Sequence, residues 1–297
     1  MRNVVRQDEY GGECILSLKK DQNSEECLDL LAAQRVLYRE AKNLWKLYGV
    51  SVIVLSLVSL IITLLLPQYK ANVAMGSFTL ALLNIFIFKK SIEHKVQQAA
   101  TIQEEFDTEV FGLNWNKHIV GKRVRKELIC EKSTRLSMSE RAKLRDWYPD
   151  VGESEYPKSV LICQRTNLYW DFELRKKYGY LVIGITILII FITFITMWIL
   201  NKSFIDSFVS FIIPISSILF LGFETGIGNL KLAEKKEKYS GEIESIIGLP
   251  GTSLEECRQI QDKIFIMRNS SSLVIESMYN WLKERFEENT RKTLKKL

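Results

Sequence analysis

The sequence predicts an all-α membrane protein in which four transmembrane helices form two hairpins and long helices extend into a mainly helical cytosolic lobe. Three observations lead to this fold class. Charged residues make up 26% of the 297 residues, yet almost all of them lie outside four apolar blocks. Each block is long enough to cross a bilayer once. Only a few residues separate the first block from the second, and the third from the fourth.

The four apolar blocks mark the expected spans. They run roughly over residues 47–66, 71–88, 179–200 and 204–223. A hydrocarbon core of about 30 Å needs about 20 helical residues, and the short connections allow only tight antiparallel turns. The chain therefore divides into an N-terminal helical region, a first membrane hairpin, a central lobe, a second hairpin and a C-terminal helical region, at 1–46, 47–88, 89–178, 179–223 and 224–297.

Local signals predict where the helices outside the spans begin and end. Ser24 precedes two glutamates and suits a helix N-terminus, from which a helix can run straight into the first span. Gly112 ends the helix that leaves the second span. Pro157 suits the first turn of a long helix into the third span. Ser253, with Glu256 three residues later, predicts a further helix near the C-terminus.

Basic residues predict the orientation of the spans. The two short turns hold one lysine each, Lys70 and Lys202, whereas the opposite ends of the spans are flanked by many more. These flanking residues are Lys42, Lys46, Lys89, Lys90, Arg175, Lys176, Lys177, Lys231, Lys235 and Lys236. The positive-inside rule places that side in the cytoplasm, so both termini and the central lobe are expected to be cytoplasmic.

Matching residues recur at a constant offset in the two halves of the chain, so the halves can be aligned in one register. Gln34-Arg35 and Gln164-Arg165 are 130 positions apart, and the same offset pairs Gly49 with Gly179. Two copies of one unit, each a cytosolic helix, a membrane hairpin and a second cytosolic helix, explain this register. Chance similarity between lysine-rich amphipathic helices explains it equally well.

The sequence shows no enzyme or cofactor motif. No phosphate-binding GxxxxGK[ST] loop, GxGxxG, GxSxG or HExxH motif is present. The five cysteines have no CxxC spacing, and His94 and His118 are not at metal-ligand spacing from other candidates. We therefore expect no catalytic residue, cofactor or metal. The formal charge of +6 lies largely beside the spans, which does not indicate DNA or RNA binding.

Small and polar residues recur at helical spacing in the second and fourth spans. The candidates for a pore lining are Ser77, Asn84, Ser210, Ser217 and Glu224. Tight helix packing is the alternative, because small residues let helix backbones approach each other in lipid. Four helices form too thin a bundle to enclose a wide channel, so a pore requires a homo-oligomer.

The order of several motifs resembles one known family. The motifs are Gln34-Arg35, the run from Ala99 to Asp107, Leu113-Asn114-Trp115-Asn116, Asp146-Trp147-Tyr148-Pro149 and Cys163-Gln164-Arg165-Thr166-Asn167. Together they resemble the SMODS-associating four-transmembrane effectors over about residues 20–290. This resemblance implies an effector of a bacterial anti-phage (CBASS) system at the inner membrane. A cognate nucleotidyltransferase would make a cyclic oligonucleotide that acts on the effector, which then forms a pore or disrupts the membrane.

An anionic cyclic nucleotide needs cationic groups for its phosphates and aromatic faces for its bases. The candidates in the central region are Arg123, Arg165, Arg175, Trp147, Tyr148 and Trp170. Alternatively, the aromatic residues anchor the core of the lobe and Arg165 pairs with Asp171 or another nearby carboxylate. A third interpretation of the same residues is a protein surface that docks the synthase.

Two other functions compete with a signal-gated pore. One is a membrane-anchored scaffold or sensor that recruits a soluble signalling partner and conducts nothing. The other is an enzyme, which would need catalytic groups that no local pattern reveals.

Overall fold

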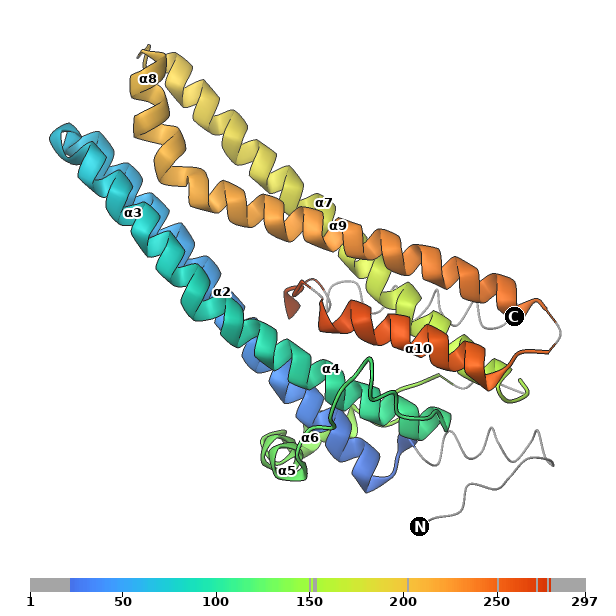
Figure 1. The fold of residues 1–297 in the computed structure, drawn as a ribbon. Coiled ribbons are helices and arrows are strands. Elements are labelled where there is room, and N and C mark those ends of the chain that lie inside the picture. Colours follow the sequence, from blue (N-terminus) through green and yellow to red (C-terminus); the bar gives the residue numbers. More distant parts are fainter. Residues whose placement is uncertain are drawn as a thin grey trace.

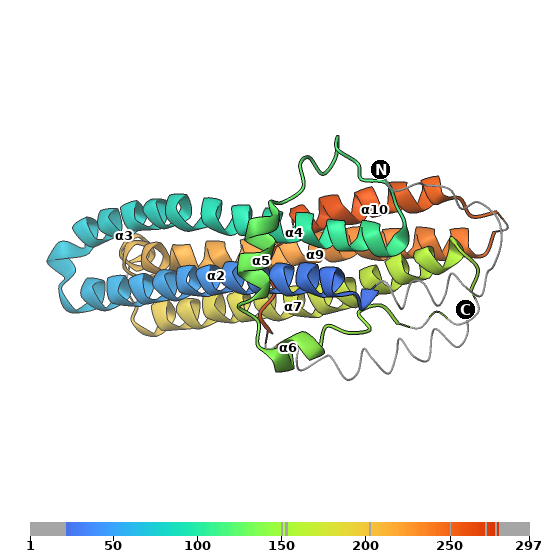
Figure 2. The same cartoon turned by 90° about the horizontal axis from the view of Figure 1, so that it is seen from below.

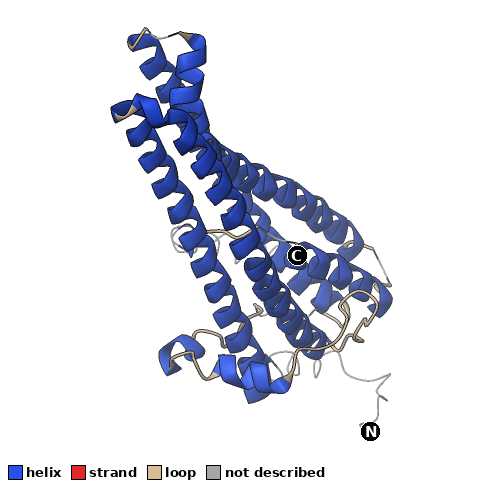
Figure 3. Cartoon of the chain, turned by 60° about the vertical axis from the view of Figure 1, so that its left-hand side comes forward, coloured by secondary structure: helices blue, strands red, loops and turns tan. Residues whose placement is uncertain are grey.

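The computed structural model describes residues 22–149, 151, 154–201, 203–249, 251–270, 272–276 and 278. The side chains of Leu80, Ala81, Leu83 and Asn84 lie outside the described set. Within the described residues every regular element is a helix (Figure 3). The all-α prediction is confirmed.

The first hairpin consists of two long helical arms. Its elements are α2 (Glu25–Leu65), the 3₁₀ turn η1 (Pro67–Tyr69), α3 (Lys70–Asn84), the π turn η2 (Ile85–Lys89) and α4 (Lys90–Phe111). As predicted, Ser24 caps α2, and its hydroxyl accepts a hydrogen bond from the backbone N–H of Cys27 at 3.3 Å. Gly112 ends α4 at φ 67°, a left-handed conformation that glycine adopts without strain.

The second hairpin repeats this plan. Its elements are α7 (Lys158–Ile199), α8 (Phe204–Ser207), the π turn η3 (Phe208–Ile212) and α9 (Ile213–Ile247). Pro214 has no N–H to donate, and the π turn directly precedes it. The returning arm bends there, as Figure 1 shows between the labels α8 and α9.

In the part of the chain that the structure describes, three helices are long and apolar enough to cross a membrane: Glu25–Leu65, Lys158–Ile199 and Phe204–Ile247. They contain the first, third and fourth predicted spans. The second predicted span lies on α3 and η2, which lead directly into α4. Large apolar side chains on these segments face outward, for example Phe86 and Trp198, which are 76% and 82% exposed. This apolar exterior, which lipid would cover, is that of an all-α membrane protein.

The long arms run side by side and the two turns lie at the same end of the molecule (Figures 1 and 2). Within each half, α2 packs on α4 and α7 packs on α9. Between the halves, α9 packs on α2 and α10 (Leu254–Asn269) packs on α4. α2 has 41 residues and α7 has 42, which agrees with an internal duplication, although the duplication stays a prediction.

The opposite end of the bundle carries the helical lobe. Here α5 (Lys126–Ser133), α6 (Met138–Ala142) and α10 surround the inner ends of the long arms. The core is continuous, and its fully buried members include Phe106, Leu144 and Leu161. The predicted mainly helical lobe is therefore confirmed, and it covers the ends of both hairpins.

Glycines bring α7 and α9 into close contact. A β-carbon at Gly222 would lie 2.2 Å from Oγ1 of Thr186, and one at Gly226 would lie 2.5 Å from Cγ1 of Ile183. Thr186 and Gly226 are buried between the two helices. Small residues at such a crossing let helices approach closely in lipid, where the hydrophobic effect does not drive helix association.

We expect Gly222→Val to destabilise the second hairpin by about 1–3 kcal/mol, because the new side chain overlaps Thr186. Thermal unfolding in detergent micelles measures this. Gly184→Val on α7 is the matched control, since a β-carbon at Gly184 meets nothing within 4 Å. Equal melting temperatures for the two variants would contradict the close packing.

Candidate functional site

A stripe of hydroxyl side chains on α2 faces the interior of the membrane part. Ser56, Ser59 and Thr63 are 3%, 2% and 3% exposed and follow each other at steps of three and four. Thr63 Oγ1 donates a hydrogen bond to the Ser59 carbonyl at 2.8 Å. Ser59 Oγ has no partner among the described residues. The helical spacing of these hydroxyls is visible in the sequence, whereas their burial is not.

The facing part of the second hairpin also carries buried hydroxyls. Ser207 and Ser210 are 2% and 6% exposed, and their segment, α8 with η3, leads into α9. α2 contacts both η3 and α9. We call Ser56, Ser59, Thr63, Ser207 and Ser210 the hydroxyl seam, because they lie in the buried interior of the two-hairpin bundle.

The residues predicted to line a pore take different positions. Ser210 is buried in the hydroxyl seam, Ser77 and Ser217 are half-buried, and Glu224 is exposed. The side chain of Asn84 lies outside the described residues. The structure therefore brings Ser210 into the seam and places Glu224 at its lobe end.

Two ion pairs connect the hairpins, one near each end of the spans. Lys70 Nζ lies 2.9 Å from Asp206 Oδ1 at the turns, and Lys89 Nζ lies 3.4 Å from Glu224 Oε1 at the lobe end. Both pairs are solvent-exposed in the structure. Exposed pairs of this kind contribute little stability, about 0–1 kcal/mol.

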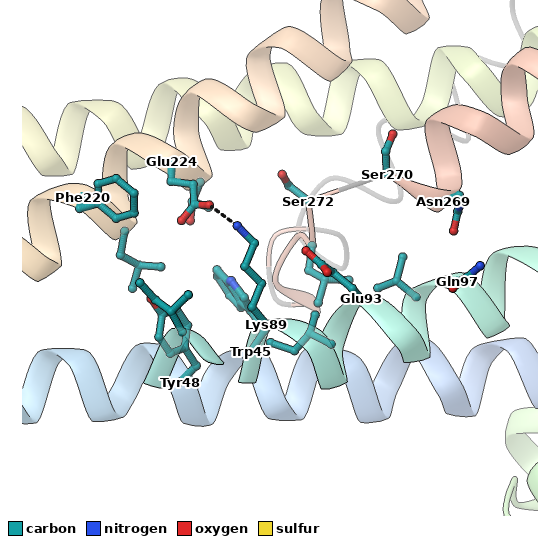
Figure 4. A pocket seen from close by; sticks show the side chains of 16 residues that line it. Trp45, Tyr48, Lys89, Glu93, Gln97, Phe220, Glu224, Asn269, Ser270 and Ser272 are labelled. Carbon is teal, nitrogen blue, oxygen red and sulfur yellow. Dashed lines mark hydrogen bonds and ion pairs between the residues drawn. The ribbon is translucent and has the colours of Figure 1, made fainter. Parts of the chain in front are cut away.

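A cavity of about 610 Å³ opens between the hairpins beside Lys89 and Glu224 (Figure 4). Its lining is contributed by α2, η2, α4, α9, the end of α10 and the segment after it. The lining residues are Trp45, Tyr48, Ile85, Lys89, Ile92, Glu93, Val96, Gln97, Phe220, Leu221, Glu224, Thr225, Asn269, Ser270, Ser272 and Leu273. Tyr48 is four residues from Val52, the first buried residue of the predicted first span, so the cavity lies at the lobe end of the hydroxyl seam.

A buried charge cluster lies between α7 and α9 on the lobe side of the cavity. Arg175 Nε donates to Asp171 at 2.9 Å, and Lys236 Nζ lies 2.5 Å from the same carboxylate. Burial alone would raise the pKa of Asp171, but the charges of Arg175 and Lys236 hold it well below its usual range. Burial lowers the pKa of Lys236 to about 8 against the opposing effect of Asp171. Arg175 also donates to Asn229 Oδ1 at 2.8 Å.

A second buried charge cluster joins α4 to α10. Glu104 and Asp107 on α4 are both 0% exposed. Arg258 Nη2 donates to Glu104 at 2.6 Å, and Arg268 Nη1 donates to Asp107 at 2.5 Å. Gln261 Nε2 donates to both carboxylates at 2.8 Å. We call these five residues the lobe ion cluster.

The predicted ligand-binding residues are not gathered at one place. Tyr148 donates its hydroxyl to Asp107 at 2.6 Å and stacks on Phe106, against which Trp147 also packs. These two aromatic residues belong to the lobe core. Trp170 packs near Val274 in a separate cluster.

The three predicted arginines are each held by a carboxylate. Arg165 pairs with Glu244 at 3.1 Å, not with Asp171, and Arg175 takes Asp171 instead. Arg123 pairs with Glu105 at 2.7 Å, and its guanidinium lies 4.7 Å from the ring centroid of Trp115. Arg175 also donates to the Ser272 carbonyl, and Trp170 packs against the cluster that contains Val274.

The fold and these sites define a class of protein: an all-α membrane protein in which two helical hairpins extend into a lobe that buried ion pairs between helices hold together. The sequence matches the family model of the SMODS-associating 4TM effector domain over residues 17–297, and the chain belongs to this family. The resemblance drawn from its motifs is thereby confirmed. The chain is also similar to a Bacillus cereus (strain VD146) protein described as a probable CBASS effector molecule. The identity is 27% over 271 residues, covering 89% of this chain and 92% of that protein. No solved structure matches the chain.

We expect Arg268→Met to destabilise the lobe by about 3–5 kcal/mol, because it leaves the fully buried Asp107 without its cationic partner. Thermal or denaturant unfolding in detergent measures the effect. Arg145→Met is the matched control: its pair with Glu25 is exposed, and its loss should cost less than about 1 kcal/mol. Similar losses in both variants would show that the lobe ion cluster is not buried as described.

Glu104 should make the stability of the lobe depend on pH. Burial and then the charge of Asp107 raise the pKa of this carboxyl to about 7, in spite of Arg258. The folded state therefore binds this proton more tightly than the unfolded chain, so the stability that Glu104 contributes at low pH is lost as the pH rises through 7. Each tenfold difference in proton affinity is worth about 1.4 kcal/mol.

Glu104→Gln removes this titration. Between about pH 5 and pH 8 the wild type should lose up to about 3 kcal/mol relative to the variant. Melting curves of both proteins across that range provide the measurement. A constant difference between them would mean that Glu104 keeps one protonation state throughout.

Proposed function

We propose that the protein is a bacterial anti-phage effector that permeabilises the inner membrane by forming a pore when a cyclic oligonucleotide acts on it. Membership of a four-transmembrane effector family and similarity to a probable CBASS effector support a membrane effector in antiviral defence. The observation that carries the pore is the hydroxyl seam. Lipid provides no partner for buried hydroxyls, whereas water in a pore does.

The lobe and both termini are proposed to be cytoplasmic. The many lysines and arginines at the lobe end of the spans, against Lys70 and Lys202 at the turns, support this orientation. The lobe then faces the compartment in which a cognate nucleotidyltransferase makes its product. On this basis the chain has five regions, which are residues 1–46, 47–88, 89–178, 179–223 and 224–297.

The pore is proposed to form from several copies of the chain. In the single chain Ser56, Ser59 and Thr63 are buried, so the seam holds no continuous open path. Opening requires the hairpins to separate and neighbouring copies to complete the wall. Ser210, Ser217, Ser77, Asn84 and Glu224 are then candidate lining residues with the seam.

The messenger is proposed to bind the lobe directly through cationic and aromatic side chains. Arg175 and Trp170 are the best placed of the six candidates, since Arg175 bonds to the Ser272 carbonyl in the cavity wall and Trp170 packs against the cluster that contains Val274. All six candidates have protein partners, so binding has to replace contacts within the protein. The family suggests an effector that acts without catalysis.

A non-conducting scaffold that recruits a soluble partner is the second candidate. The observation that favours it is the size of the lobe core, which offers a rigid platform for a partner. The scaffold and the pore differ in one property, which is flux through the membrane.

We expect cells that co-express the protein and its active cognate synthase to lose membrane potential and take up an impermeant dye. Ser217→Leu should reduce dye uptake roughly tenfold or more, because an apolar constriction dewets a narrow pore. Ser216→Leu is the matched control, since Ser216 is exposed on the same helix. If the wild type arrests growth without dye uptake, the pore hypothesis is contradicted and the scaffold hypothesis is favoured.

A further inference from the structure

Residues 272–276 and 278 pass between the two hairpins at the border of spans and lobe. We call this segment, described at 272–276 and 278, the strap. On the side of the first hairpin, Leu273 is 7% exposed and packs in one cluster with Ala41 of α2 and Val96 of α4. The strap therefore occupies apolar surface that both arms of the first hairpin provide.

The strap also packs on the second hairpin. Val274 and Met278, 7% and 8% exposed, form a cluster with Leu174 and Tyr178 of α7. Trp45 of α2 packs against both strap clusters. A single short segment thus buries apolar side chains against α2, α4 and α7 together.

Two features hold the strap close to the second hairpin. Arg175 Nη1 donates a hydrogen bond to the Ser272 carbonyl at 2.5 Å. A β-carbon at Gly228 of α9 would lie 2.8 Å from Oγ of Ser272, so a side chain at this position has to displace the Ser272 hydroxyl. A hydrogen bond to a charged donor is stronger than a neutral one, which makes Arg175 the main polar anchor.

The strap forms part of the cavity wall. Asn269, Ser270 and Ser272 lie toward the lobe end of the cavity, away from Phe220 at its membrane end (Figure 4). Leu273 completes this wall. The strap therefore contributes to the lobe-end wall of the cavity.

We propose that the strap is a built-in lock that holds the hairpins in a closed arrangement and must leave its seat before the membrane part can open. The two ion pairs between the hairpins are exposed and weak. The strap contributes buried apolar contacts and a charge-assisted hydrogen bond at the lobe end of the spans. This inference rests on the proposed function for what the opening does, but the seating of the strap can be measured separately.

The first experiment measures whether the strap is seated. Leu273→Cys serves as a buried reporter in a background of Cys14→Ser and Cys130→Ser, since Cys130 is exposed and Cys27, Cys163 and Cys257 are buried. In purified protein, Arg175→Met or Gly228→Ala should speed maleimide labelling of the reporter about tenfold or more, because the first removes a hydrogen bond to the strap and the second displaces the Ser272 hydroxyl. Gly241→Ala on α9 is the control, since a β-carbon there meets nothing within 4 Å.

The same variants test what release of the strap does. In liposomes without any nucleotide, Gly228→Ala should cause dye efflux and Gly241→Ala should not. Unchanged labelling in both Arg175→Met and Gly228→Ala would overturn the strap as a lock. If labelling is faster but no protein releases dye, with or without the synthase product, the strap is still a lock and the proposed pore is wrong.

A disulfide provides the converse test. The β-carbon at position 228 would lie 3.9 Å from Cβ of Ser272, within the range that a disulfide spans. Gly228→Cys with Ser272→Cys should cross-link under mild oxidation and abolish dye uptake in cells with active synthase, and a reductant should restore it. Ser272→Cys alone is the control, whereas Gly228→Cys alone should loosen the strap as Gly228→Ala does. Full dye uptake by the oxidised double variant would show that the strap need not move.

Discussion

The lobe ion cluster between α4 and α10 is the interaction on which the mutual arrangement of the two halves depends. Glu104 and Asp107 are fully buried, and each is matched by an arginine on a helix more than 150 positions away in the chain. Removing charges from water is costly, so such carboxylates are stable only where partners meet them with good geometry. The requirement for these partners selects one docking of α10 on α4, and α10 in turn positions the strap.

Away from the lobe the halves are held more weakly. In the membrane part, α7 and α9 are packed tightly through Gly179, Gly222 and Gly226, which makes the second hairpin a unit. Between the hairpins lie the hydroxyl seam, two exposed ion pairs and a cavity of about 610 Å³. The lobe is held by buried ion pairs, whereas the hairpins meet through weaker contacts. A conformational change in the lobe can therefore alter how the two hairpins are arranged.

Much of the fold could be predicted because its causes are local. Four apolar blocks and two short turns are properties of neighbouring residues, and the cap at Ser24 and the capping box of Ser253 with Glu256 are encoded within one helical turn. The sites were harder to predict. Trp147, Tyr148 and Arg165 have the residue types of a nucleotide site, but the structure gives them protein partners in the lobe. The stripe of Ser56, Ser59 and Thr63 was readable by its spacing, but its burial was not.

By itself the sequence determined the helical class, the membrane segments and the family, because apolar length and motif order are properties of the chain alone. Only the tertiary structure decided which carboxylate each arginine meets, which polar faces are buried and what lies between the hairpins. These features join α2, α4, α7, α9 and residues 272–278 across long separations. Their free energy depends on burial and geometry that exist only after the helices have packed.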